Sequence, residues 1–136
     1  MKENVSTIST KLSDYIAYPF LIPKVNLDFN IYEDEVVVQS SFYVKPKLEE
    51  PTKLILKGVE IDLFSISING RELDSEKYNL SNHDLVINNP PIAAFELNIK
   101  SRIDPFKNTS LEGLYSSCGM LATQCEAEGF RRICFH

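Results

Sequence analysis

The stretch TQCEAEGFRR, from Thr123 to Arg132, concentrates side chains that could do chemistry. It contains two carboxylates, one amide, one thiol and two guanidinium groups. A carboxylate is the natural partner of an ammonium group, and this pairing strengthens where the pair is partly removed from water. Two alternatives follow for the stretch: a strand face exposed to solvent, or one wall of a pocket for a cation.

If this stretch were extended, alternate side chains would share a face. One face would then carry Gln124, Glu126 and Glu128, and the opposite face Thr123, Cys125 and Ala127. On this pattern both Gln124 and Glu126 can reach a single pocket, while Cys125 packs inward. We expect Glu128, Arg131 and Arg132 to form structural ion pairs at a domain boundary.

Two other kinds of site find little support in the sequence. The chain has two histidines, His83 and His136, and no HExxH motif, so it lacks the ligand set of a zinc hydrolase. We expect His83 to be exposed, because it lies in a predicted turn. No GxSxG motif is present, and Cys125 has no evident histidine partner. The sequence therefore predicts no catalytic residue and no metal ligand in this chain.

From Tyr18 onward the apolar residues recur with a period of two, which is typical of β-strands. Residues 24–34 predict a half-buried strand, and residues 36–46 a second strand that forms a hairpin with it. The apolar positions of the first are Val25, Leu27, Phe29 and Ile31. Those of the second are Val36, Val38, Phe42 and Val44, with Pro46 closing it.

Further strands are predicted on either side of Gly58, and the apolar parity slips before Ile66, which indicates a β-bulge. Asn69–Gly70 is the strongest hairpin turn in the sequence. Residues 78–87 predict another hairpin, and residues 93–101 a strand with Phe95, Leu97 and Ile99 inward. With no convincing helix, the pattern favours an all-β, antiparallel two-sheet sandwich.

The bulk composition narrows the function classes. The chain has 136 residues, enough for one domain, and a net charge of −5 without a basic patch, which argues against nucleic-acid binding. Its three cysteines lack CxxC spacing, as expected for reduced thiols. No secretory signal or membrane-spanning run is evident. We expect a cytoplasmic protein with a loose leader at residues 1–17 and one domain at 18–136.

Two segments resemble a known family. NTSLEGLYSS (Asn108–Ser117) and GMLATQCEAEGFRRICFH (Gly119–His136) resemble the N-terminal domain of the zinc-dependent aminopeptidase N family, of the bacterial alanyl aminopeptidase type. The INGREL hairpin and the order of elements upstream are similar too, so the resemblance covers the chain from about Tyr18.

The resemblance implies a saddle-shaped β domain that packs on a thermolysin-like catalytic domain carrying the zinc ligands. It also implies that Glu126 helps to hold the free α-amine of the substrate and that Gln124 lines the pocket for the first side chain. A fixed carboxylate would distinguish a free N-terminus from an internal peptide and would place the scissile carbonyl one residue away.

The chain departs from the family's pattern because it stops at His136, without GxMEN or HExxH. We therefore expect a fragment that is inactive alone and binds no zinc, from a parent zinc aminopeptidase that removes N-terminal residues from peptides. The apolar ending at Ile133, Cys134 and Phe135 suggests a surface left by the missing catalytic domain. The alternative is a free-standing β-sandwich binding module without enzymatic activity.

Overall fold

The computed structural model describes residues 9–50 and 52–136, and these residues form ten β-strands and three short 3₁₀ helices. The elements are η1 (Leu12–Asp14), β1 (Phe20–Ile31), β2 (Val36–Pro46), β3 (Leu54–Lys57), β4 (Asp62–Ile68), β5 (Arg71–Glu72), η2 (Ser75–Lys77), β6 (Tyr78–Leu80), β7 (Asp84–Ile87), β8 (Phe95–Ile103), β9 (Gly113–Ser117), β10 (Met120–Gln124) and η3 (Gly129–Arg132). The all-β prediction is confirmed. None of the helices described is long and apolar enough to cross a membrane.

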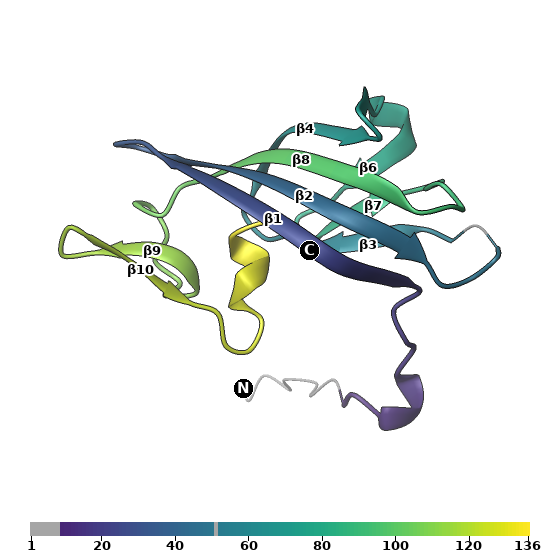
Figure 1. Cartoon of the computed structure of the whole chain (residues 1–136). Coiled ribbons are helices and arrows are strands. Elements are labelled where there is room, and N and C mark those ends of the chain that lie inside the picture. Colours follow the sequence, from purple (N-terminus) through teal and green to yellow (C-terminus); the bar gives the residue numbers. More distant parts are fainter. Residues whose placement is uncertain (1–8, 51) are drawn as a thin grey trace.

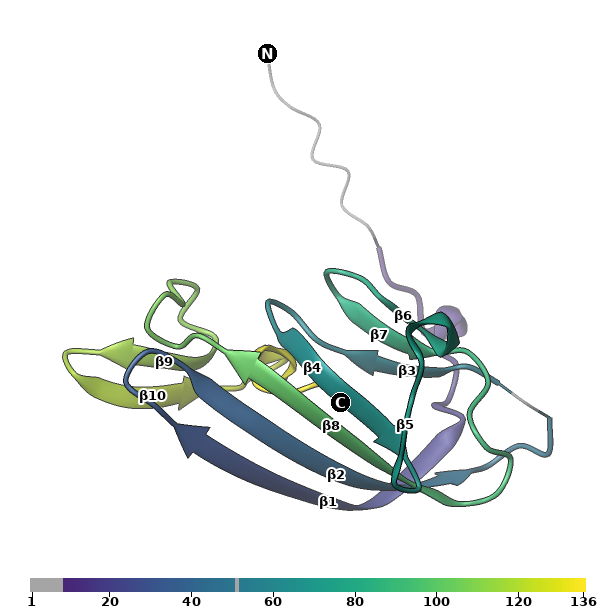
Figure 2. The same ribbon diagram turned by 90° about the horizontal axis from the view of Figure 1, so that it is seen from above.

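The strands form three antiparallel sheets, two of which pack face to face. The large sheet has the order β1-β2-β8-β4-β5, and the small sheet the order β3-β7-β6. The third sheet is the β9–β10 hairpin, which lies to one side of the other two (Figures 1 and 2). Residues 1–8 of the expected leader lie outside the described residues, whereas residues 9–17 are exposed and include η1.

The main core lies between the large and small sheets. Phe42 and Leu97 enter it from the large sheet, and Leu54 and Leu85 from the small sheet; all four are buried. The inward positions predicted for Phe95, Leu97 and Ile99 are confirmed, as are those of β2. Because buried apolar area supplies most of the folding free energy, this interface is the principal source of the domain's stability.

The predicted turns and hairpins are also confirmed. β1 pairs with β2, and β6 with β7. The β4–β5 turn has positive φ at both Asn69 (49°) and Gly70 (78°), as a type I′ turn requires. The register of β4 against β8 shifts between Leu63 and Ser65, which is the bulge that the slip in apolar parity indicated.

Strand β1 differs from its prediction as a half-buried strand. Val25, Phe29 and Ile31 are exposed, and only Leu27 of the four predicted positions is partly covered. Val25 pairs with Phe42 and therefore points to the same side of the sheet. Val25, Phe29 and Ile31 stay uncovered because β1 is the edge of the large sheet and the small sheet packs over other strands, whereas Phe20 at the start of β1 is buried in the main core.

The C-terminal segment corrects a second expectation. Ile133, Cys134 and Phe135 are buried in the domain's own core instead of forming an exposed edge. Phe135 belongs to the main core, and the other two pack with Val36, Val38 and Ile103 in a second cluster. The backbone of His136 exchanges two hydrogen bonds with Lys57, at 2.7 and 3.1 Å. The apolar ending of the sequence is therefore explained by packing within this domain.

Candidate functional site

The candidate site lies at the end of the β9–β10 hairpin. The two strands join through Cys118 and Gly119, both with positive φ, and Gln124 at the end of β10 pairs with Gly113 at the start of β9. After Gln124 the chain leaves the strand and turns through residues 126–128 into η3. The turn places the segment 124–128 beside the sandwich, between the hairpin and the C-terminal 3₁₀ helix (Figure 1).

The predicted strand face shared by Gln124 and Glu126 is wrong, because the strand ends at Gln124. Glu126 begins the turn, and its peptide bond to Ala127 is cis. Both side chains are exposed, and neither has a hydrogen-bond or ion-pair partner within residues 9–50 and 52–136. The relative position of Gln124 and Glu126 is thus set by a turn of the backbone and not by alternation along a strand.

A carboxylate in this position can take an ammonium group, but in open water it does so weakly. Coulomb attraction between charges in contact is only about 1 kcal/mol in bulk water and rises several-fold when solvent is partly excluded. A hollow of about 840 Å³ on the structure is lined by Tyr18, Ile55, Lys57 and His136 and does not involve Gln124 or Glu126. Tight binding at Glu126 therefore requires a further surface that covers it.

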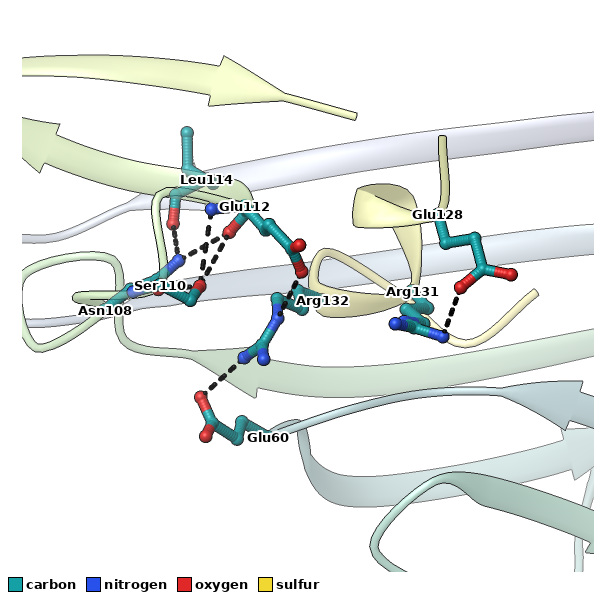
Figure 3. Close-up of polar contacts among 8 residues, drawn as sticks. All are labelled: Glu60, Asn108, Ser110, Glu112, Leu114, Glu128, Arg131 and Arg132. Atoms are coloured by element: carbon teal, nitrogen blue, oxygen red, sulfur yellow. Dashed lines mark hydrogen bonds and ion pairs between the residues drawn. The ribbon is translucent and has the colours of Figure 1, made fainter. Parts of the chain in front are cut away.

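The loop before β9 is organised by Asn108. Its side-chain amide donates to the carbonyl oxygens of Glu112 (2.7 Å) and Leu114 (2.9 Å), and its Oδ1 accepts from the backbone and hydroxyl of Ser110 (Figure 3). Asparagine commonly closes such loops on its own backbone. These bonds set the path by which residues 108–112 enter the hairpin.

Arginine side chains then tie this loop to the rest of the domain. Arg132 Nη1 donates to Glu60 at 2.9 Å and Arg132 Nε to Glu112 at 3.3 Å, while Arg131 pairs with Glu128 at 2.8 Å (Figure 3). Glu128, Arg131 and Arg132 form ion pairs as expected, while their expected place at a domain boundary stays a prediction. Arg132 is the more enclosed of the two arginines, with 19% of its side chain exposed against 36% for Arg131.

The thiols and histidines differ in how far they are buried. Cys125 is half-buried and packs against the second cluster, in line with its predicted inward position, whereas Cys118 is exposed. Burial raises the pKa of the Cys134 thiol to about 12. His83 is exposed as predicted, and the His136 ring stacks edge-on against Phe130, with centroids 5.1 Å apart.

The residues described do not fit a zinc ion. No group of three or more His, Cys, Asp or Glu side chains within the described ranges is placed to hold a metal. A structural or catalytic zinc site needs at least three such protein ligands. The chemistry available at the site is therefore that of one free carboxylate and one free amide.

Sequence reasoning missed the partners that hold the site in place. Asn108 received no role, although an Asn two residues before a Ser is a recognisable turn signal. Glu60 lies 72 positions from Arg132 in the chain, so no local pattern could pair them. Glu112 lies 20 positions from Arg132, and the β9–β10 hairpin between them brings the two side chains together.

No protein-family profile matches the chain, but comparisons with curated proteins and with solved structures find relatives. The chain is 37% identical to aminopeptidase N of Caulobacter vibrioides over 127 residues, and 37% identical to that of Escherichia coli over 123 residues. These alignments cover 93% and 90% of this chain but only 15% and 14% of those proteins. The chain thus spans about a seventh of the length of the curated relatives it matches.

Solved structures share the fold. The chain superposes on Legionella pneumophila aminopeptidase A, a structure in complex with aspartic acid, with a TM-score of 0.83 and 29% identity over 93% of this chain and 15% of that one. An M1 zinc metallopeptidase of Deinococcus radiodurans has the same fold at a TM-score of 0.66 and 14% identity, over 83% of this chain and 28% of that one.

The fold is therefore that of the all-β N-terminal domain of M1 aminopeptidases. Within that class, the chain is homologous to aminopeptidase N over 90% or more of its length. The resemblance inferred from residues 108–136 is confirmed.

Proposed function

We propose that this chain is the N-terminal domain of a zinc metallo-aminopeptidase that removes N-terminal amino acids from peptides. In this proposal Glu126 holds the α-ammonium group of the substrate, and Gln124 lines the pocket for its first side chain. The observation that carries the proposal is the free carboxylate of Glu126, presented beside the sandwich in a chain homologous to aminopeptidase N.

The chemistry of an exopeptidase explains why one carboxylate suffices. In an internal residue the nitrogen on the α-carbon belongs to an uncharged amide, and only at a free N-terminus is it an ammonium group. A fixed carboxylate therefore selects N-terminal residues. Pairing also orients the first residue, and positioning of this kind can replace a large part of the entropic cost of reaction. The exposed amide of Gln124 adds a donor and an acceptor next to this anchor.

The proposed partner is the enzyme's own catalytic domain, which would cover Glu126. The uncovered apolar side chains of β1, Val25, Phe29 and Ile31, support a partner surface, because contiguous exposed apolar residues commonly mark contacts. The zinc ion of the proposed enzyme belongs to that partner domain, since the described residues of this chain do not form a metal site. We infer that this chain alone does not hydrolyse peptides.

The test is Glu126→Gln in the full-length protein that contains this domain, assayed on amino-acid p-nitroanilides. Loss of one charged contact should lower kcat/KM by about 10- to 100-fold while the zinc content stays unchanged. Glu128→Gln is the matched control, because Glu128 is an exposed glutamate two residues away whose pair with Arg131 lies at the surface. This control should change kcat/KM by less than about threefold.

Two other outcomes would contradict parts of the proposal. An unchanged kcat/KM in the Glu126→Gln variant would show that Glu126 is not the amine anchor. A natural protein that consists of this β domain without a catalytic domain, and that has no peptidase activity, would instead favour the free-standing binding module.

A further inference from the structure

Arg132 connects three segments that lie far apart in the chain. It belongs to η3, its Nη1 reaches Glu60 in the loop between β3 and β4, and its Nε reaches Glu112 directly before β9. A guanidinium group presents donors in a planar fork and can hold two carboxylates at once, which a lysine ammonium does less well. Figure 3 shows Arg132 between the two glutamates.

The backbone around Arg132 is packed without room for side chains. A β-carbon at Gly113 would lie 2.7 Å from Cβ of Arg132, and one at Gly129 would lie 3.2 Å from the amide nitrogen of Gly113. Real β-carbons essentially never come as close as 2.7 Å, and a contact of 3.2 Å is tighter than most real ones. The start of β9 and the start of η3 are therefore in direct contact, and Arg132 lies against Gly113 as well.

The segment that carries Gln124 and Glu126 is attached to these same two elements. Gln124 pairs with Gly113, so its position follows that of β9. At the other end, the amide of Gly129 donates to the carbonyl of Cys125 at 3.0 Å, which closes the turn against η3. Any shift of β9 relative to η3 would therefore move Glu126.

We propose that Arg132 is a positioning residue that holds η3 to β9 through Glu112 and to the β3–β4 loop through Glu60, and thereby sets the place of the Glu126 carboxylate. This inference rests on the proposed function of Glu126. Arg132 does not touch the substrate; it acts through the turn. Arg131 joins no distant segments, because its partner Glu128 lies only three residues earlier in the chain.

The domain offers a matched control for this arrangement. Arg102 on β8 also bridges two carboxylates, with Nη1 at 3.3 Å from Glu35 and Nε at 3.1 Å from Asp62. Its neighbours Ser101 and Ile103 are buried, so alternation places Arg102 on the outer face of the large sheet. Arg102→Gln removes the same kind of double ion pair without touching the hairpin or η3.

The first measurement is amide exchange by NMR on this 136-residue chain. The reporters are Gly129, whose amide donates to Cys125, and Val59, whose amide donates to the carbonyl of Arg131 at 2.8 Å. In Arg132→Gln both amides should exchange about tenfold faster or more through local opening, while Arg102→Gln leaves them unchanged. If Arg132→Gln does not fold, Arg132→Lys, which keeps the charge but loses the fork, serves for the same comparison.

The second measurement is a double-mutant cycle between Arg132→Gln and Glu126→Gln in the full-length enzyme. A misplaced anchor should lower kcat/KM about 10- to 100-fold when Glu126 is present, and the effect should nearly vanish in the Glu126→Gln background. Arg132→Lys should recover part of the activity. A general loss of stability would instead lower activity equally in both backgrounds.

The outcomes separate the two proposals. Unchanged exchange at Gly129 and Val59 in the Arg132 variant, or equal losses of kcat/KM in both backgrounds, would overturn the positioning role. Unchanged kcat/KM in Glu126→Gln alone would overturn the proposed function of Glu126, whatever the exchange rates show for Arg132.

Discussion

The carbonyl oxygen of Gln124 occupies the place that a side chain at position 129 would take beside Gly129. A β-carbon there would overlap this oxygen and also crowd the amide nitrogen of Gly113. The end of β10, the start of β9 and the start of η3 therefore meet at one glycine. This contact brings the two residues of the candidate site next to the C-terminal segment.

The contact predicts that Gly129→Ala displaces the turn and destabilises the domain. Overpacking at a closed backbone contact should lower the free energy of unfolding by about 1–3 kcal/mol, measured by urea denaturation. Gly119→Ala is the control, because Gly119 has positive φ but nothing within 4 Å of its added β-carbon. It should cost only about 1 kcal/mol of backbone strain. Equal effects of the two substitutions would show that the Gly129 contact is easily relieved.

The burial of Phe135 predicts that the C-terminal segment is part of the cooperative fold. Phe135 fills the space beside Gly58 and belongs to the main core, so Phe135→Ala should cost about 3–5 kcal/mol. Phe64 is 52% exposed, and Phe64→Ala should cost less than about 1 kcal/mol. Urea midpoints of the two variants check this, and a Phe135 variant as stable as the Phe64 variant would contradict the packing.

The buried thiol of Cys134 predicts a loss of stability at alkaline pH. Burial raises its pKa from the ordinary 9.0 to about 12, so the unfolded chain releases this proton at lower pH than the folded domain. The stabilisation is complete below pH 9.0 and is lost as the pH rises toward 12. The expected slope is about 1.4 kcal/mol per pH unit for this one group.

The measurement compares urea unfolding of the natural chain and Cys134→Ala between about pH 9 and pH 11. The variant should lose stability less steeply. Burial also raises the pKa of Tyr18 to about 12, in the same direction, so Tyr18→Phe must be measured as a separate control. Parallel curves for the natural chain and Cys134→Ala would show that this thiol does not govern the slope.

The three thiols should also differ in reactivity toward a disulfide reagent such as DTNB. Cys118 lies exposed in the β9–β10 turn and should react at once, whereas Cys134 is fully buried and should react only when the domain opens. Cys118→Ser should remove the fast phase alone. Fast reaction of Cys134 in that variant would mean that the second cluster opens readily.

If Gln124 lines the first-side-chain pocket, Gln124→Leu in the full-length enzyme should shift its preference toward apolar first residues. A change of one pocket contact is typically worth about 10- to 100-fold in the ratio of kcat/KM between two substrates. Thr123→Val is the control, because Thr123 precedes Gln124 on β10 and points to the opposite side of the strand. An unchanged ratio in Gln124→Leu would place the pocket elsewhere.

Local features of the fold were predictable because they depend on neighbours in the chain. The period of two indicated most of the strands, Asn69–Gly70 indicated the β4–β5 turn, and the slip before Ile66 indicated the bulge. Each depends on backbone sterics or side-chain alternation within a few residues. The expected cytoplasmic location and leader, by contrast, stay predictions.

The sequence indicated which residues form the candidate site but not how they are arranged in space. The composition of the stretch containing Gln124 and Glu126, and its resemblance to aminopeptidase N, indicated that it could form a site. Its assumed extended conformation was wrong, because alternation does not report where a strand ends. The strand stops at Gln124, where the chain must turn toward η3 to bury Ile133 and Phe135.

The sequence by itself indicated most of the strands, the tight turns and the carboxylate and amide side chains of the candidate site, since these follow from local conformational preference and side-chain chemistry, but it did not indicate the β9–β10 hairpin. Only the tertiary structure decided that β1 is an uncovered edge, that the apolar C-terminal residues are core, and that Arg132 joins Glu60 to Glu112. These relationships link positions distant in the chain, and they arise from how sheets stack and which surfaces remain to be buried.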